Sequence, residues 1–279
     1  MGQHFLEVET PIRCPNIIPE AHIDPVLSDS HYLQASPELC MKRLLSQGHE
    51  KIFQICKCFR KNERGPRHLP ELTLLEWYES GTTYLNLMDQ CQGLFRHIAK
   101  GLDRGTHLAY QDATIDLELP FDRITVEQAF NIHGSKSAIQ ALTDGSFDEI
   151  MSFEVEPCLG DKRPCILYDY PAPLASLARL KPENTKLAQR FELYVAGIEL
   201  ANGFTELTDP ILQRQRFLKE NNLRETRGET ALPLPEKFLF DLNTMPEAAG
   251  IALGVDRLVM LFCNASTIDE VVTFTPESL

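Results

Sequence analysis

The chain has 279 residues, of which 43% are hydrophobic and 24% are charged, and its formal net charge at pH 7 is −13. This composition excludes an intrinsically disordered chain and supplies enough apolar surface for one large domain or two small ones. Proteins whose main role is to bind nucleic acid usually present a basic surface. The net negative charge therefore argues against extensive tRNA binding, and we do not expect tRNA as a partner.

Neither a membrane segment nor a cysteine framework is indicated by the sequence. No apolar run approaches the roughly 20 residues that a membrane helix needs. The segment from Met1 to Pro11 lacks the basic-then-apolar order of a signal peptide. The eight cysteines include no C-x-x-C pair, which argues against a zinc ribbon and favours free thiols in a reducing compartment. We therefore expect a soluble, cytoplasmic protein with no membrane partner.

The first part of the chain predicts a short strand, a loop and a helix. Alternating residues over 5–10 end at a proline and predict a strand, and an irregular loop is expected over 14–31. Ser36 suits the N-cap of the next helix, with Pro37 in its first turn and Gly48 at its end.

A long antiparallel hairpin is predicted next, formed by strands over 51–60 and 71–79 with a charged loop between them. Helical spacing follows over 84–101, and Thr125 with Gln128 has the pattern of a capping box before another helix.

The second half of the chain adds further hairpins and helices, which together predict an α+β fold in a single domain over 1–279. The expected elements are a mixed helical and loop region over 134–164, a strand over 165–170, a hairpin formed by 189–195 and 198–201 around Ala196-Gly197, a helix from Asp209-Pro210 to about residue 222, a loop over 225–236, and a strand over 250–254 that leads into a helix at Asp256.

Three segments carry the most specific pattern when they are taken together. They are Phe59-Arg60 with Pro70–Tyr78 on either side of the charged loop, Glu192–Glu206 with its Asn202-Gly203-Phe204 tripeptide, and Gly250–Arg257. In this order they resemble motifs 2 and 3 of the class II aminoacyl-tRNA synthetases, and residues 6–11 resemble motif 1, which ends in a proline at the dimer interface. The resemblance implies an antiparallel sheet flanked by helices and a homodimer.

Within that family the chain is most similar to the lysine branch. Ser36-Pro37-Glu38, Arg190-Phe191-Glu192 and Asn202–Leu207 resemble segments of lysyl-tRNA synthetases. Other segments are closer to the short paralogues that ligate β-lysine to elongation factor P and lack an anticodon-binding domain. We expect this chain to lack that domain too, because no room for it precedes Met1.

Activation of a carboxylate by ATP develops negative charge on phosphorus oxygens, which fixed cations stabilise. Arg60 lies at a strand end, and Arg257 lies in the first turn after a glycine-flanked strand. The resemblance places Arg60 at the α-phosphate and Arg257 near the adenine and γ-phosphate, which makes them the expected catalytic residues. The residues expected to bind ATP are Arg60, Asn62, Glu63, His68, Glu199, Leu200, Gly254 and Arg257.

Glu192 and Glu199 are the expected ligands of Mg²⁺. If the hairpin turns at Ala196-Gly197, Glu192 faces Ala201, and Glu199 lies on the same face about 7–8 Å away as a diagonal neighbour. Two carboxylates on one face can share magnesium, which takes oxygen ligands. In the family that the chain resembles, these positions hold the metals that bridge the phosphates of ATP.

A diamino acid needs anionic partners for its amines. Glu76 and Tyr78 are two apart on a strand and therefore share a face. By resemblance, Glu38 and Glu76 would bind the amine nearer the carboxylate, and Tyr78 and Glu206 would bind the ε-amine. The full expected substrate set is Ser36, Glu38, Glu76, Tyr78, Asn202, Phe204, Glu206 and Ala252.

Ala252 bears on the choice between lysine and β-lysine. Lysyl-tRNA synthetases carry glycine there and the β-lysine ligases carry alanine, but a difference of this size is worth only about 1–3 kcal/mol. Both amino acids therefore stay open as substrates.

The charged loop departs from the family pattern at three positions. Asn62 stands where the family has a glutamate, Leu69 where it has an asparagine, and Leu72 where a phenylalanine stacks on adenine, whereas His68 matches. Asparagine lacks the charge of glutamate, and leucine stacks less specifically, so we expect adenine affinity to be affected.

The leading hypothesis is a ligase that forms an aminoacyl-adenylate and passes the acyl group to a lysine of elongation factor P. One alternative is aminoacyl transfer to tRNA or to a small molecule. The other is a catalytically weak binding module, which Asn62 and Leu72 favour.

Overall fold

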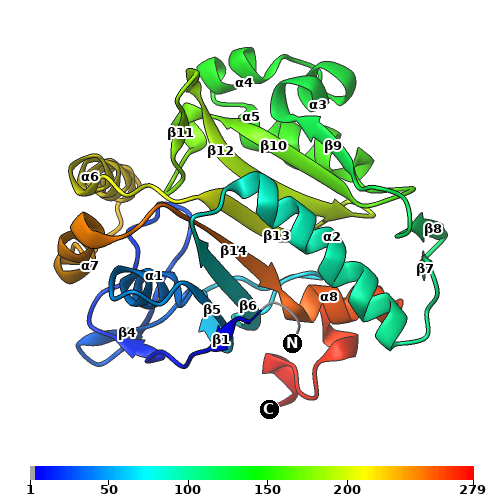
Figure 1. Ribbon diagram of the computed structural model, residues 1–279, viewed down its shortest axis with the longest axis horizontal. Coiled ribbons are helices and arrows are strands. Elements are labelled where there is room, and N and C mark those ends of the chain that lie inside the picture. The colour runs from blue at the N-terminus through cyan, green and yellow to red at the C-terminus, as the bar shows by residue number, and fades with distance from the viewer. Residues whose placement is uncertain (1–3) are drawn as a thin grey trace. The chain divides into compact units, whose positions relative to one another are not determined.

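The computed structural model describes His4–Leu279, and the chain divides into two compact units. The first unit comprises Met1–Thr82 with Glu206–Asp256, and the second comprises Thr83–Thr205 with Arg257–Leu279. Each unit combines hairpins and helices (Figure 1), which confirms the predicted α+β class. Residues 1–3 lie outside the described residues. Both the expected single domain and the segment compared with a signal peptide begin within them.

The sheet of the first unit is built around the predicted hairpin. β5 (Lys51–Phe59) and β6 (Glu71–Ser80) pair antiparallel along their whole length, as the sequence predicted. β14 (Ala248–Gly254) pairs antiparallel with the other edge of β6, and the short β1 (Leu6–Glu7) runs parallel to β5. The register sets Gly250 of β14 opposite Tyr78 of β6.

The helix α1 (Glu38–Ser46) forms where it was expected, but its N-cap is Pro37 and not Ser36. The Ser36 hydroxyl still accepts a hydrogen bond from the backbone N–H of Glu38 at 3.0 Å, so it satisfies a donor at the start of the helix. Gly48 follows the helix with a φ of 93°, in the left-handed region that favours glycine.

Elsewhere in the first unit the sequence prediction was partly wrong. The expected loop over 14–31 contains one whole short strand and an end of each of two others, which together form a three-stranded sheet. The expected loop over 225–236 is followed by a helix that was missed. Strands of two or three residues are too short to show a period of two. The bounds are β2 (Arg13–Cys14), β3 (Val26–Ser28), β4 (His31–Leu33), α6 (Pro210–Thr226), α7 (Glu236–Asp241) and the 3₁₀ turn η4 (Leu242–Thr244).

The second unit has a sheet with the strand order β13-β12-β10-β9, and β11 pairs with β12. β12 and β13 form the predicted hairpin, with positive φ at Ala196 (50°) and Gly197 (68°), as two-residue hairpin turns require. The bounds are β9 (Asp122–Thr125), β10 (Cys165–Pro171), β11 (Leu180–Lys181), β12 (Asn184–Val195) and β13 (Ile198–Thr205).

The predicted pairing of Glu192 with Ala201 was wrong. Val195 pairs with Ile198 as expected, but a register shift follows, and Glu192 pairs with Asn202. A β-bulge places an extra residue on one strand, and nothing in the sequence marked it.

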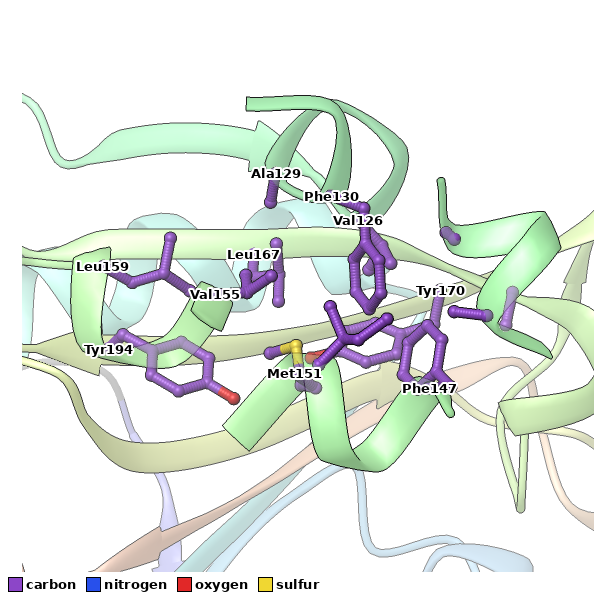
Figure 2. Close-up of a cluster of buried hydrophobic side chains, with 14 of the residues drawn as sticks. Val126, Ala129, Phe130, Phe147, Met151, Val155, Leu159, Leu167, Tyr170 and Tyr194 are labelled. Atoms are coloured by element: carbon purple, nitrogen blue, oxygen red, sulfur yellow. The ribbon is translucent and has the colours of Figure 1, made fainter. Parts of the chain in front are cut away.

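A hydrophobic cluster in the second unit packs helices against the sheet (Figure 2). Phe130 of α3 (Val126–His133) stacks on Phe147 with 4.6 Å between ring centroids, and Tyr194 of β12 belongs to the same cluster. The predicted capping box of Thr125 and Gln128 is confirmed at the start of α3.

The helix α2 (Tyr84–Gly101) has the bounds that the sequence predicted. Among the described residues, none of the helices combines the length and apolarity needed to cross a membrane. The remaining elements are β7 (His107–Tyr110), β8 (Ala113–Asp116), α4 (Ala138–Asp144), α5 (Phe147–Ile150), η1 (Met151–Val155), η2 (Glu156–Cys158), η3 (Ala172–Leu174), α8 (Val255–Phe262), η5 (Ile268–Val271) and η6 (Pro276–Ser278).

The hydrophobic cluster predicts a large effect of truncating Phe130. Phe130→Ala removes a fully buried ring and leaves a cavity, so the free energy of unfolding should fall by about 3–5 kcal/mol in urea denaturation. Ile132→Ala on the same helix is the matched control, because Ile132 is 66% exposed, and it should change stability by less than about 0.5 kcal/mol. Equal effects of the two substitutions would contradict this account of the core.

Candidate active-site residues

The first unit holds a glutamate cluster, which we define as Ser36, Glu38, Lys42, Glu76, Tyr78 and Glu206. Three of its charged residues, Lys42, Glu76 and Glu206, are each 1% exposed. The Lys42 ammonium contacts the carboxylate of Glu38 and lies 2.5 Å from Oε2 of Glu206. Burial of a charge is costly unless it is paired, and here one cation lies between two anions.

Local geometry explains how these side chains meet. Glu38 and Lys42 are four apart on α1, a spacing that places side chains on one helix face. Glu76 and Tyr78 are two apart on β6 and share a strand face. The backbone N–H of Glu206 donates to the carbonyl of Ala248 at 2.9 Å, which fixes Glu206 beside β14.

Hydrogen bonds orient two of the carboxylates differently. The Ser36 hydroxyl donates to Oε1 of Glu76 at 2.6 Å, and the Tyr78 hydroxyl donates to Oε2 at 2.8 Å, so both oxygens of Glu76 are engaged. Oε1 of Glu206 is buried and has no hydrogen-bond partner among the described residues. A buried acceptor without a donor is costly, and this oxygen is suited to a donor from a ligand.

Burial and mutual repulsion shift the titration of the cluster. Burial, together with the charge of Glu38, raises the pKa of Glu76 to about 7. Burial also raises the pKa of Glu206 to about 8, with Lys42 opposing the shift. Burial lowers the pKa of Lys42, but the charges of Glu206 and Glu38 outweigh it and the net pKa is raised. Lys42 therefore stays protonated while Glu76 and Glu206 titrate near neutral pH.

Four of the expected ATP residues of the first unit lie on the loop that joins β5 to β6, namely Arg60, Asn62, Glu63 and His68. The Arg60 guanidinium lies 3.7 Å from Glu63, and its buried Nε has no hydrogen-bond partner among the described residues. Asn62 has a φ of 66°, and Gly65 and His68 exchange backbone hydrogen bonds across the loop. Arg60 thus retains a buried donor, which a phosphate oxygen would satisfy.

A second group, the tyrosine–glutamate cluster of the second unit, surrounds Glu192. We define it as Glu156, Tyr170, Arg190, Glu192, Tyr194 and Glu199. The Tyr170 and Tyr194 hydroxyls donate to Oε2 of Glu192 at 2.5 and 2.6 Å, and the Arg190 guanidinium donates to Oε1 at 2.7 Å. These three donors hold the carboxylate in one orientation.

Glu199 and Glu156 complete this cluster. Arg257 donates to the backbone carbonyl of Glu199 at 2.7 Å and lies 3.5 Å from its carboxylate. Burial, together with the charges of Glu199 and Glu192, raises the pKa of Glu156 to about 7. The contact of Arg257 with Glu199 brings an expected phosphate-binding residue beside an expected Mg²⁺ ligand, and both roles stay predictions.

The donor chemistry of the tyrosine–glutamate cluster fits Mg²⁺. The side chain of Glu199 is 39% exposed, and Oε1 of Glu192 accepts a hydrogen bond from Arg190 with one of its two lone pairs. Among His4–Leu279, no group of three or more His, Cys, Asp or Glu side chains is arranged to hold a metal ion. Magnesium commonly takes only one or two carboxylates and completes its shell with water and substrate phosphates, so two glutamates suffice.

Other predicted residues have contacts that the sequence did not indicate. Asn202 accepts a hydrogen bond from Arg190 at 3.2 Å, and Phe204 packs against the hydrophobic cluster of the second unit. Ala252 lies opposite Glu76, and Gly254 lies opposite Leu74, in the pairing of β14 with β6. Their roles in binding stay predictions, as does that of Leu200, which is buried in β13.

Sequence reasoning missed several members of the two clusters. Lys42 had a usable signal, since a glutamate followed four residues later by a lysine is a favourable pair on a helix. Arg190 and Tyr194 had one as well, since each lies two residues from Glu192 on the same strand and therefore shares its face. Tyr170 and Glu156 had none, because their partners come from another strand or turn. The missed residues are Lys42, Glu156, Tyr170, Arg190 and Tyr194.

Comparisons with known proteins show the family of the chain. A family model described as tRNA synthetases class II (D, K and N) matches residues 1–278. The chain belongs to this family. The resemblance inferred from the three motifs is thereby confirmed, and membership implies the use of ATP.

Curated relatives extend the match across the chain. The chain is 37% identical over 290 residues to the elongation factor P–(R)-β-lysine ligase of Pectobacterium atrosepticum, covering 98% of this chain and 89% of the relative. It is 37% identical to proteins of the same name from Edwardsiella ictaluri and Klebsiella pneumoniae, covering 97% of this chain and 88% of each relative.

Gly250 supplies a test of the packing in the glutamate cluster. A Cβ at this position would lie 2.6 Å from Oε1 of Glu206 and would overlap ring carbons of Tyr78. Gly250→Ala should therefore lower the free energy of unfolding by about 1–3 kcal/mol in urea denaturation. Gly93→Ala on α2 is the control, because its Cβ meets open space, and it should be neutral or stabilising by up to about 1 kcal/mol. A neutral Gly250→Ala would contradict the close approach of Tyr78 and Glu206.

Proposed function

We propose that this protein is an ATP-dependent ligase that activates (R)-β-lysine, or lysine, as an adenylate and transfers it to a lysine side chain of elongation factor P. The observation that carries the amino-acid assignment is the glutamate cluster, which has three carboxylates around one fixed ammonium and a buried, unpartnered oxygen on Glu206. The names of the curated relatives support the acyl acceptor.

The glutamate cluster would bind and orient the amines of the substrate. Glu38 and Glu76 would hold the amine nearer the carboxylate, and Tyr78 and Glu206 would hold the ε-amine. Each engaged carboxylate is fixed by a hydrogen bond or an ion pair before the substrate arrives, so little orientation is lost on binding.

In the first chemical step, a carboxylate oxygen of the amino acid attacks the α-phosphorus of ATP, and the bond to the β-phosphate oxygen breaks to release pyrophosphate. Arg60 would bind the α-phosphate with its unpartnered Nε, and Arg257 would bind near the adenine and γ-phosphate. Glu192 and Glu199 would hold Mg²⁺, which neutralises phosphate charge when it is bound.

In the second step, the neutral amine of the acceptor lysine attacks the acyl carbon, AMP leaves, and the nitrogen loses a proton to give an amide. The acceptor supplies the nucleophile, so the protein needs none of its own. Homodimer formation and a cytoplasmic location stay predictions.

Aminoacyl transfer to tRNA or to a small molecule is the second candidate function. The membership of the chain in a family described as tRNA synthetases supports it. It shares the first chemical step with the ligase and differs only in the acceptor.

Pyrophosphate exchange tests the activation step. The wild-type chain with ATP, Mg²⁺ and β-lysine or lysine should incorporate labelled pyrophosphate into ATP. Glu206→Gln should raise KM for the amino acid by at least about 30-fold, because its amide cannot neutralise an ammonium. Glu79→Gln is the matched control, since Glu79 pairs with Lys51 away from the cluster. Absence of exchange with both amino acids would favour a binding module without catalysis.

The acceptor is tested separately by mass measurement. Elongation factor P incubated with the enzyme, ATP and β-lysine should gain the mass of one β-lysyl group. If pyrophosphate exchange occurs, elongation factor P gains no mass and tRNA is acylated, then tRNA is the acceptor and elongation factor P is not.

The pH dependence follows from the raised pKa values of Glu76 (about 7) and Glu206 (about 8). Below these values the free protein holds protons that must leave before an ammonium group binds. The kcat/KM for the amino acid in pyrophosphate exchange should therefore rise between pH 6 and 8, by about tenfold per unit for each proton released. The KM for ATP is the reference, because ATP carries no ammonium group. It should not change in this way between pH 6 and 8. A flat kcat/KM profile from pH 6 to 8 would contradict the shifted carboxylates.

A further inference from the structure

Lys42 is a cation enclosed by the carboxylates that the proposed function assigns to the substrate. Its side chain is 2% exposed and contacts both Glu38, from its own helix, and Glu206, from a distant part of the first unit. A buried lysine is stable only when its charge is compensated, and two partners provide that compensation here. Lys42 is therefore a permanent component of the cluster and competes for the same carboxylates as an incoming amine.

The charge count of the cluster follows from these contacts. With Glu38, Glu76 and Glu206 ionised, three negative charges face the single positive charge of Lys42, which leaves a net charge of −2. Two ammonium groups neutralise that charge. A ligand with one ammonium group leaves a buried carboxylate uncompensated, which is costly in a low-dielectric interior.

The geometry of Glu206 gives an independent indication of a ligand. Lys42 engages Oε2, while Oε1 is buried and has no hydrogen-bond partner among the described residues. Because the ion pair fixes one oxygen, the other is held in place as an acceptor.

We propose that Lys42 is a specificity-determining positioning residue, which pairs with Glu38 and Glu206, leaves a net charge of −2 for the ligand, and thereby selects amino acids with two ammonium groups over those with one. The identity of the amino acid rests on the proposed function. The charge selection rests on the cluster alone.

The titration of the cluster supports this role. The charge of Lys42 lowers the pKa of both Glu76 and Glu206, against burial and the charge of Glu38, which raise it. The titratable groups around Lys42 are Glu38 on α1, Glu76 and Tyr78 on β6, and Glu206 beside β14. Without Lys42 the carboxylates would hold protons to a higher pH and would lose the charge that discriminates between ligands.

Binding calorimetry on the full chain tests the proposal without requiring catalysis. Each diamino acid is compared with its analogue lacking the terminal ammonium: lysine with norleucine, and β-lysine with 3-aminohexanoic acid. The wild-type chain should bind the better diamino acid at least about 30-fold more tightly than its analogue at pH 7. If the dissociation constants of the diamino acid and its analogue differ by less than threefold in both pairs, the proposal is overturned.

Lys42→Met keeps most of the side-chain volume and removes the charge. At pH 7 the preference for the diamino acid should fall at least tenfold, and it should recover as the pH rises toward 9, because the extra proton is then released. A merely structural defect would not be reversed by pH. Lys51→Met is the matched control, since Lys51 is half-buried and forms an ion pair with Glu79 at 2.6 Å, and it should retain the wild-type preference. An unchanged preference in Lys42→Met would overturn the proposal.

If circular dichroism shows that Lys42→Met does not fold, Lys42→Arg and the wild-type chain decide the question. Lys42→Arg keeps the charge and should keep the preference. In the wild-type chain, calorimetry in two buffers of different ionisation enthalpy should show more protons released with lysine than with norleucine, and equal release would overturn the proposal.

Ammonium-selective binding without pyrophosphate exchange would disprove the ligase function alone, whereas exchange without selectivity would disprove the role of Lys42 alone.

Discussion

The ammonium of Lys42 lies between carboxylates from two distant parts of the first unit, Glu38 on α1 and Glu206 beside β14. Without that cation, three carboxylates would repel one another, and Glu76 and Glu206 would hold their protons to a higher pH. The ion pair also ties α1 to the segment that carries Glu206. The electrostatics of the glutamate cluster and the orientation of its acceptors therefore depend on this one contact.

The two clusters solve the problem of buried negative charge in different ways. In the first unit a cation compensates the carboxylates, and one oxygen of Glu206 remains without a donor. In the second unit, Glu192 is stabilised by two tyrosine hydroxyls and by Arg190, whose guanidinium also lies over the ring of Tyr170 at 4.5 Å. Three donors, one of them cationic, hold this carboxylate in one orientation, which suits an oxygen ligand for a divalent cation.

The departure at Asn62 has a backbone explanation. Its φ of 66° lies in the left-handed region, which asparagine adopts more readily than glutamate does. Arg60, two residues earlier, keeps an ion pair with Glu63 and a buried donor without a partner. The loop thus has an uncharged side chain at Asn62 and a carboxylate at Glu63, beside the arginine for which phosphate binding is proposed.

The sequence by itself determined the elements whose patterns are local and long. The hairpin of β5 and β6, the helix α2 and the capping box at Thr125 were predicted because alternation, helical spacing and capping chemistry are written within a few residues. The sequence motifs likewise predicted the family and most of the residues proposed to bind ATP, Mg²⁺ and the amino acid. Tertiary structure alone decided the pairing of Glu192 with Asn202, since a bulge depends on both strands. It also decided that Lys42 lies between Glu38 and Glu206, because a contact across 164 residues of chain exists only after the sheet and helices have packed, and burial then determines which charges must be paired.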